Sequence, residues 1–240
     1  MQTINLLFRR DYAINDTIRI QIPTVGEVLE DEDGYYSLVS ILTAMPIDFM
    51  VQLDDLGIDF TQINEYELFL LLFPSIQKQD AHLVFGDLDR SKFKFAQNES
   101  TGQTVLLDDE NDIVIDRLIL GQIAATLRKI HNLEKNRKKP GNKEAKEYML
   151  ERARQKMRRN KNRRRTSQLE ALIVAMVNTE QYKYDFEGTK ELSIYQFNES
   201  VRQVIKKVDY DNRMFGVYTG NIDAKKLSRD ELTWLNDKST

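Results

Sequence analysis

The sequence has no cysteine at all. This absence excludes a disulfide framework and cysteine-based metal sites, and it suits a reducing cytosol. Met1 is followed by "QTINLLFRRDY", which has neither the apolar region nor the small-residue cleavage site of a secretory signal. The longest apolar run, residues 171–177, is far shorter than the roughly 20 residues that a membrane helix needs. We therefore expect a soluble intracellular protein with no membrane partner.

Residues and motifs typical of catalysis are also scarce. The chain has two histidines, His82 and His131, in unrelated contexts, and no HExxH pair. The nucleophile elbow G-x-S-x-G is absent, and so are the phosphate loops G-x-x-x-x-G-K-[ST] and G-x-G-x-x-G. We expect the protein not to be an enzyme and to use no cofactor.

Two acidic stretches are candidate metal sites. In "EDEDG", residues 30–34, placing Gly34 at the sixth position of a calcium loop puts Leu29 at position 1 and Ser40 at position 12. Both carboxylates that such a loop requires there are missing. "DDEND", residues 108–112, has no glycine in the required place. We expect both stretches to be solvated turns, because Asp and Asn form local hydrogen bonds in turns, and we expect no metal site.

Charge is distributed very unevenly. Residues 128–165 contain 17 Lys or Arg and 4 Glu, whereas the rest of the chain has 18 basic and 34 acidic residues. The near-neutral total of −3 therefore hides an acidic protein with a basic insert.

The first third of the chain shows strand and helix signals. "TIRIQIP", residues 17–23, alternates as a half-buried strand does, and "TINLLF", residues 3–8, could pair with it. We expect a break at Asp33-Gly34, a short helix that Gly57 ends, and a helix over residues 62–73 that Thr61 caps and that stops before Pro74.

A section rich in short apolar runs follows. The runs are "AHLVFGDL", "SKFKFAQ", "QTVLLDD" and "NDIVID", and they predict a small antiparallel sheet over residues 82–116. Asp116 is placed to cap a helix over residues 117–130.

The basic tract begins with a turn at Pro140-Gly141 and continues in helix-forming residues over 143–164. Ala145, Met149 and Ala153 repeat every four residues and lead to Met157, a stripe too narrow for a core helix. This helix should lie on a surface or project from one. The arginines that could contact a partner or phosphate are Arg152, Arg154, Arg158, Arg159, Arg163, Arg164 and Arg165.

Three roles are open for the tract. Lys and Arg side chains can neutralise phosphates, so nucleic-acid binding through residues 137–165 is one role. The tract holds a single aromatic residue, Tyr148, which gives little support to base stacking. The acidic rest of the chain or an acidic partner offers a protein surface instead, and a solvated linker is the third role. We favour contact with an acidic protein surface and keep nucleic-acid binding as the alternative.

The last 75 residues carry clear helix starts. Ser167 with Glu170, Ser193 with Gln196, and Ser228 with Glu231 each have the spacing of a capping box. Behind Ser193, one apolar stripe comprises Ile194, Phe197, Val201, Val204, Ile205 and Val208.

Further along, "MFGVYTGNID" offers Met214, Phe215, Val217 and Tyr218 either as core or as an exposed docking patch.

The pieces "IYQFNESV", "MFGVYTGNID" and "ELTWL", within residues 192–235, resemble the ends of proteins encoded in the tail-gene clusters of tailed phages of Gram-positive bacteria. The resemblance implies a role in tail or baseplate morphogenesis, such as that of a tail assembly chaperone. It implies tail structural proteins as partners, and the host cytoplasm or the virion as the location.

Together these features predict an α+β fold that is predominantly helical. We expect a mixed α+β domain over residues 1–131 with the small antiparallel sheet, a basic helical connector over 132–166, and a helical C-terminal unit over 167–240. The expected function is a non-enzymatic role in phage tail morphogenesis, as an assembly chaperone or as a tail or baseplate component, through protein–protein contacts.

Overall fold

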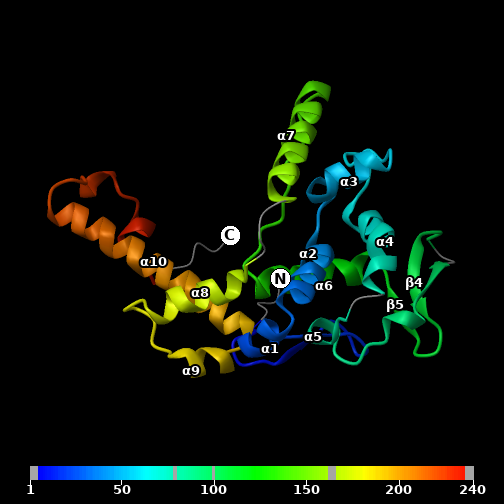
Figure 1. Ribbon diagram of the computed structural model, residues 1–240, viewed down its shortest axis with the longest axis horizontal. Helices are drawn as coiled ribbons and strands as arrows, with labels where there is room; N and C mark the ends of the chain where they lie inside the picture. Colours follow the sequence, from blue (N-terminus) through cyan, green and yellow to red (C-terminus); the bar gives the residue numbers. More distant parts are fainter. Residues whose placement is uncertain (1–4, 78–79, 99–100, 162–165, 236–240) are drawn as a thin grey trace.

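A computed structural model of the protein describes residues 5–77, 80–98, 101–161 and 166–235 (Figure 1). It is an α+β fold with helices predominating, as the sequence predicts. The elements of the first half are β1 (Asp11–Ala13), β2 (Arg19–Gln21), α1 (Val25–Glu30), α2 (Glu32–Thr43), η1 (Pro46–Phe49), α3 (Met50–Asp55), α4 (Glu65–Ile76), α5 (His82–Phe85), η2 (Arg90–Lys92), β3 (Lys94–Gln97), β4 (Thr104–Asp108) and β5 (Ile113–Ile115). The second half consists of α6 (Arg117–Ile130), α7 (Lys143–Lys161), α8 (Gln168–Val177), α9 (Phe186–Glu191), α10 (Ile194–Tyr218), η3 (Ala224–Lys226) and η4 (Arg229–Leu232).

A strand forms within residues 17–23, but the prediction that it pairs with residues 3–8 is wrong. β2 pairs antiparallel with β1, and Tyr12 lies opposite Ile20. The Asn15 side chain accepts hydrogen bonds from the backbone N–H groups of Thr17 and Ile18 at 3.0 and 2.7 Å. Such an asparagine turn reverses the chain within a few residues, and so brings the segment just before it into register.

The second sheet has the antiparallel order β3-β4-β5, which confirms three of the four predicted strands. The fourth prediction is wrong, because residues 82–85 form helix α5. The side chain of Asp80 accepts a hydrogen bond from the backbone N–H of His82 at 3.0 Å and starts a turn there. A short continuous apolar run does not distinguish a strand from a buried helical turn, and Val84 and Phe85 are buried in the core.

The expected break at Asp33-Gly34 lies slightly earlier, at Asp31. The Asp31 carboxylate caps α2 by accepting a hydrogen bond from the N–H of Gly34 at 3.1 Å. A β-carbon on Gly34 would lie 2.1 Å from an oxygen of that carboxylate, so the cap needs a glycine at this position. Residues 30–34 are thus a helix–helix junction and not a loop.

Helix α4 begins and ends later than its sequence suggests. Asn64, and not Thr61, caps it in a complete capping box with Glu67. The Thr61 hydroxyl instead bonds the Asp59 carboxylate at 2.7 Å. The helix continues through Pro74 because the proline lies in its last turn and Ile76 beyond it is buried at 1% exposure.

Other helix signals are confirmed. Asp116 caps α6, with 2.8 Å between its carboxylate and the N–H of Ile119, and Gly57 follows the end of α3 with φ of 71°. Ser193 and Gln196 form a complete capping box at the start of α10. Ser228 and Glu231 do the same, but they open the 3-10 helix η4.

One large hydrophobic core contains residues from both ends of the described chain. It joins Ile20 and Leu38 to Leu127 of α6, and also to Ile173 of α8 and Phe197 of α10. Residues before 131 and after 167 therefore share a core, and the three-part division of the chain stays a prediction. No helix among the described residues is both long and apolar enough to cross a membrane.

Candidate functional site

The basic helix α7 is bound to an acidic part of the same chain. Arg154 lies 2.7 Å from a carboxylate oxygen of Asp54 and 2.7 Å from one of Asp55, both at the end of α3. About two turns earlier on the same helix, the Lys146 ammonium lies 2.8 Å from a carboxylate oxygen of Asp59. Two cations of the basic tract therefore form ion pairs with the acidic end of α3 and the loop after it.

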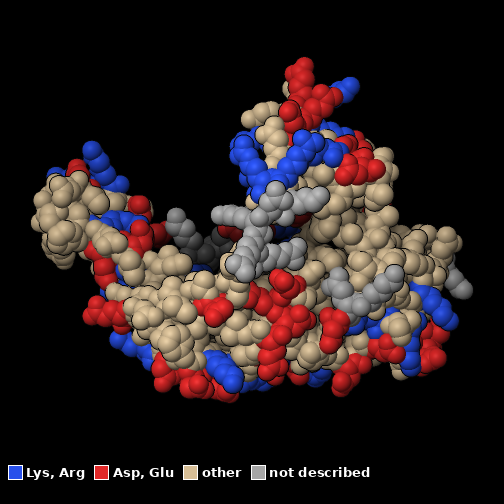
Figure 2. Space-filling model, viewed as in Figure 1, with Lys and Arg blue, Asp and Glu red and all other residues tan. Residues whose placement is uncertain are grey.

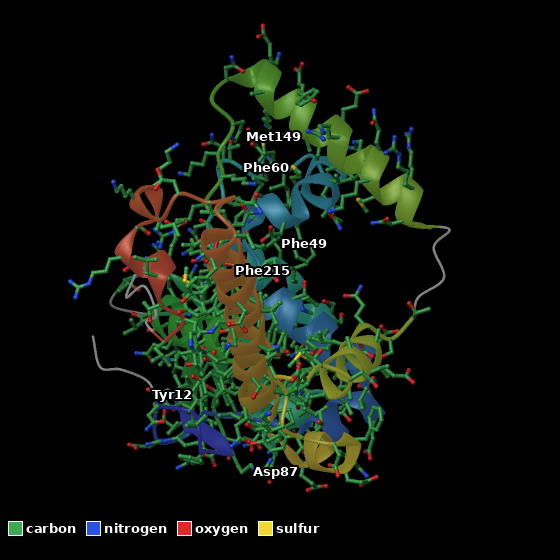
Figure 3. All side chains as sticks on the ribbon, turned by 90° about the vertical axis from the view of Figure 1, so that its left-hand side faces the viewer. Tyr12, Phe49, Phe60, Asp87, Met149 and Phe215 are labelled. Carbon is green, nitrogen blue, oxygen red and sulfur yellow. The ribbon has the colours of Figure 1, made fainter. Side chains whose placement is uncertain are left out.

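An apolar contact lies between these two ion pairs. Leu150 of α7 is 8% exposed and belongs to a second, smaller core cluster with Leu53 and Phe60. Met149 packs against the same cluster, and Figure 3 shows it beside Phe60 beneath α7. The Lys146 ammonium also lies 5.6 Å from the centre of the Phe60 ring. A cation in that position is attracted to the face of the ring.

The contact line of α7 is therefore Lys146, Leu150 and Arg154, spaced every four residues. The apolar pattern alone favoured the neighbouring stripe, of which Met149 is half-buried and Met157 is 47% exposed. The stripe does not include Leu150, which is the next residue after Met149 and has no apolar residue four positions before or after it. The sequence feature that indicates this contact line is the pair Lys146 and Arg154, four residues before and after Leu150. These two cations match the carboxylates of residues 54–59.

The ion pairs alter the titration of Asp59 and Arg154. Hydrogen bonding to Lys146, and then to the backbone and hydroxyl of Thr61, lowers the pKa of Asp59 to about 2. The hydrogen bonds that Arg154 donates to Asp55 and Asp54 raise the pKa of its guanidinium above the ordinary value. The ion pairs thus favour the charged forms of Asp59 and of Arg154.

The arginines of the outer surface of α7 are arranged differently. Arg152, Arg158 and Arg159 are exposed, and the guanidinium of Arg152 lies 5.6 Å from the ring centre of Tyr148. Lys and Arg side chains gather over this helix in the space-filling view (Figure 2). The predicted contacts Arg163, Arg164 and Arg165 lie outside the described residues.

The second candidate surface is the far end of α10, which extends away from the rest of the fold (Figure 1). At its base Ile194 and Phe197 are fully buried, and Val201 and Val204 pack on the large core. Beyond Val204, no described residue of α10 belongs to either core cluster. The helix thus has an anchored half and a projecting half.

The chain after α10 folds back along the projecting half. Gln203 donates a hydrogen bond to the backbone oxygen of Trp234 at 3.1 Å, and Arg213 donates one to that of Glu231 at 3.0 Å. A β-carbon on Gly216 would lie 2.6 Å from the end of Ile222, so glycine allows the two segments to approach closely. We call residues 205–235 the arm.

The predicted patch on the arm divides into two pairs. Met214 and Val217 are half-buried. Phe215 and Tyr218 are exposed, at 69% and 86%. Figure 3 shows Phe215 on the α10 ribbon, away from Phe60 and Met149. Two large aromatic side chains therefore lie on the outside of a projecting helix, one turn apart.

The two histidines occupy contrasting environments. His131 is half-buried and packs against the rings of Tyr35 and Tyr36, and its Nε2 lies 3.0 Å from the Tyr35 hydroxyl. Burial lowers the pKa of His131 to about 4, so it is neutral at physiological pH. His82 is exposed and lies 3.0 Å from Asp80. The imidazole of His131 therefore contributes to packing, and that of His82 to a hydrogen bond at the surface.

The two acidic stretches form hydrogen bonds, one within its own turn and the other also to a distant helix. In the turn between β4 and β5, Asp108 accepts hydrogen bonds from the backbone of Glu110 and from the backbone and side chain of Asn111. Glu32, in the other stretch, accepts from the N–H groups of Gln168 and Leu169 at 3.0 Å each, at the start of α8. Within the described part of the chain, no group of three or more His, Asp or Glu side chains could hold a metal ion.

Comparison with known protein families gives a match in the C-terminal part of the chain. A protein-family profile described as the YomV second domain matches residues 159–238, which include α8, α9, α10 and the arm. That family takes its name from a protein of Bacillus phages and prophages. The C-terminal third of the chain is therefore similar to a phage-associated domain. No curated protein and no solved structure matches the chain.

Proposed function

We propose that this protein is a non-enzymatic morphogenesis protein of a tailed phage, which acts through protein–protein contacts as a tail assembly chaperone or as a tail or baseplate component. The observation that carries the proposal is the arm, which lies in the region similar to a phage-associated domain and presents Phe215 and Tyr218 to solvent. Aromatic side chains are enriched among the residues that contribute most binding energy in protein interfaces.

The anchoring of α10 suits this role. A long helix with one half in the core and one half outside it presents a docking element at a fixed distance from the fold. The hydrogen bonds from Gln203 to Trp234 and from Arg213 to Glu231 hold the returning segment against α10, so the exposed aromatic residues lie on an ordered surface. An ordered surface costs less conformational entropy on binding than a flexible one. Its partners would be tail structural proteins, met in the host cytoplasm or retained with them in the virion.

Affinity capture from infected or lysogenic cells tests the proposal. The tagged wild-type chain should enrich tail or baseplate proteins, and a Phe215→Ser, Tyr218→Ser double variant should lose them. Phe8→Ser is the matched control, because Phe8 is 87% exposed but lies outside the matched region, and this variant should capture the same proteins as wild type. If the wild-type chain enriches no virion component, the proposal is wrong.

A second candidate function is nucleic-acid binding by α7. It is favoured by one observation, the exposure of Arg152, Arg158 and Arg159, for which the structure gives no ion pair with a described residue. Gel-shift assays across a salt series decide the matter, because phosphate contacts weaken steeply as salt rises. An Arg158→Ala, Arg159→Ala variant should bind more weakly than wild type. Absence of binding at about 50 mM salt removes this candidate.

A further inference from the structure

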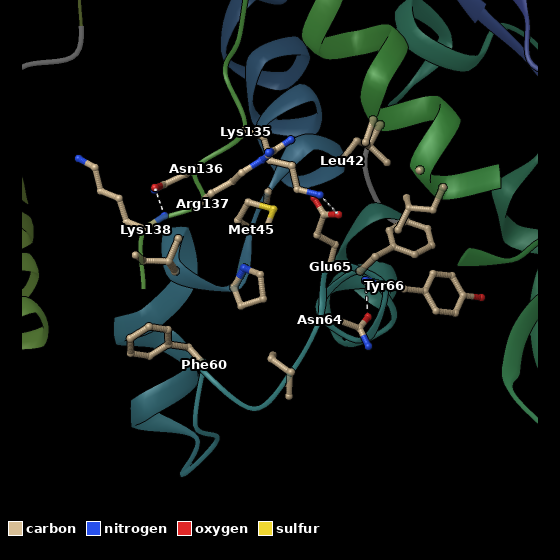
Figure 4. A pocket seen from close by; sticks show the side chains of 18 of the residues that line it. Leu42, Met45, Phe60, Asn64, Glu65, Tyr66, Lys135, Asn136, Arg137 and Lys138 are labelled. Carbon is tan, nitrogen blue, oxygen red and sulfur yellow. Dashed lines mark hydrogen bonds and ion pairs between the residues drawn. The ribbon is translucent and has the colours of Figure 1, made fainter. Parts of the chain in front are cut away.

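A pocket that the proposed function does not use lies between α6, the start of α4 and the chain after α6 (Figure 4). Its volume is about 460 Å³. Sites for small molecules in proteins measure roughly 300–1,000 Å³. The chain segment that borders it, residues 135–140, is here called the strap.

The sequence of α6 makes the space. Arg117, Gly121, Ala124 and Arg128 all line the pocket, and their spacing of four, three and four places them along one face of the helix. A β-carbon on Gly121 would meet no atom within 4 Å. The two small residues therefore leave room between two guanidinium groups.

The inner wall of the pocket is apolar. Phe60, Phe69 and Leu120 line it and are each 4% exposed. Ile63 and Met45 add further apolar surface. Such a wall favours a hydrocarbon or aromatic group over a hydrated ion, because burial of apolar surface is favourable.

Cations outnumber the carboxylate at one side of the pocket. Glu65 lies 2.6 Å from Lys135 (Figure 4). It also lies 3.0 Å from Arg128, so one carboxylate is shared by two cations. The Arg128 side chain is 13% exposed and also donates to the backbone oxygen of Thr43 at 2.6 Å. The cluster keeps a formal charge of +1 beside an apolar wall, where an added anion is attracted more strongly than in open solvent.

The strap adds to this charge. Arg137, Lys138 and Lys139 line the pocket, and the structure gives none of them an ion pair with any described residue. Asn136 fixes the strap by donating a hydrogen bond to Asp48 at 2.8 Å. The three basic side chains are thus attached to a segment that is itself tied down next to the pocket.

We propose that this pocket binds a small apolar acid, in which a carboxylate is attached to a hydrocarbon or aromatic body. The body fills the space over Gly121 and Ala124 against Phe60 and Leu120. The carboxylate lies at the cationic side, where Lys135 and the strap compensate its charge. This site is separate from the arm, so its failure would leave the proposed function standing.

Isothermal titration of the full chain with octanoate tests the proposal, and octan-1-ol serves as the uncharged probe of the same chain length. Octanoate should bind saturably at one site per chain. Octan-1-ol should bind at least about tenfold more weakly, since it lacks the charge that the cations attract.

Two variants locate the site. Gly121→Leu places a side chain in open space and removes a helix-interior glycine, so the variant should fold and should bind octanoate at least about tenfold more weakly. Arg137→Gln with Lys138→Gln should weaken octanoate and leave octan-1-ol unchanged. Phe215→Ser is the control for adsorption to the exposed arm, and it should bind octanoate as wild type does.

Three outcomes would overturn the proposal. The first is the absence of saturable octanoate binding. The second is binding that Gly121→Leu leaves unchanged while circular dichroism shows the variant folded. The third is octan-1-ol binding as tightly as octanoate, which would mean that the cations have no part in recognition.

Discussion

Arg154 of α7 and Asp54 of α3 are 100 residues apart in sequence, and their charged groups lie 2.7 Å apart. Together with Lys146–Asp59, this pair attaches the basic helix to the acidic part of its own chain. The charge asymmetry of the sequence is therefore partly an internal complementarity. The remaining cations of α7 are the ones that an external partner could reach.

Removing the Arg154 ion pairs should loosen α7 without unfolding the protein. Arg154 is partly exposed, and a surface ion pair contributes about 0–1 kcal/mol. We expect Arg154→Ala to raise amide hydrogen exchange across residues 143–161 while global stability falls by about 1 kcal/mol or less. Arg158→Ala is the control, because Arg158 has no described ion pair, and it should leave the exchange unchanged. Equal exchange in both variants would contradict the role of Arg154.

Leu150 should matter more to the docking of α7 than any of its charges. Replacing a buried leucine by alanine costs roughly 2–5 kcal/mol. Because α7 is attached at its edge, we expect the loss to appear as local opening of α7, with a smaller fall in the free energy of global unfolding. Met157→Ala, at a side chain that is 47% exposed, should change neither. Hydrogen exchange and denaturant titration of both variants provide the comparison.

His131 should make the fold less stable in mild acid. Its pKa is lowered to about 4 in the folded protein, against an ordinary value of about 6.5, so the unfolded chain binds a proton first as the pH falls. Above pH 6.5 both states are neutral and the term is absent. Between pH 6.5 and 4 the free energy of unfolding decreases, and below pH 4 the loss is complete.

From pH 7.5 to pH 5 the expected loss from His131 is roughly 2 kcal/mol. Denaturant titrations at both pH values measure it. The His131→Gln variant should lack most of this loss, whereas His82→Gln, at the exposed histidine, should keep it. The interpretation fails if His131→Gln retains the full pH dependence.

Gly216 should control the packing of the arm. Gly216→Val would place its β-carbon 2.6 Å from Ile222, which forces the returning segment away from α10. Trp234 is the only tryptophan of the chain and lies in that segment, with 5.7 Å between its ring centre and the Lys207 ammonium. We expect Gly216→Val to make tryptophan fluorescence more accessible to acrylamide quenching. Gly141→Val, at an open position in another segment, should leave quenching unchanged.

Local signals predicted much of the secondary structure. Caps such as Asp116 and Ser193 specify helix starts, because the groups that satisfy the first N–H groups lie within three residues of each other. The predictions of secondary structure were wrong where a local sequence fits two structures equally well. Thr61 and Asn64 are both acceptable caps, and residues 81–88 are apolar enough for a strand or a buried turn.

The candidate sites were predictable only in part. The basic tract and the patch at residues 214–218 are visible as charge and apolar clusters. The sequence does not show which of these side chains contact the rest of the fold and which are exposed, because that depends on the residues packed opposite them. Arg154 and Arg158 have the same chemistry, and only the first one meets a carboxylate of the described chain.

By itself, the sequence determined the α+β class, the helix starts at Asp116 and Ser193, and the concentration of positive charge in one tract. These follow from interactions between residues close in the chain. Only the tertiary structure decided that Leu150 is buried, that Phe215 is exposed, and that Gly121 borders a pocket with Glu65 and Lys135. The physical reason is that burial and charge compensation are set by residues tens of positions away, which a local pattern does not contain.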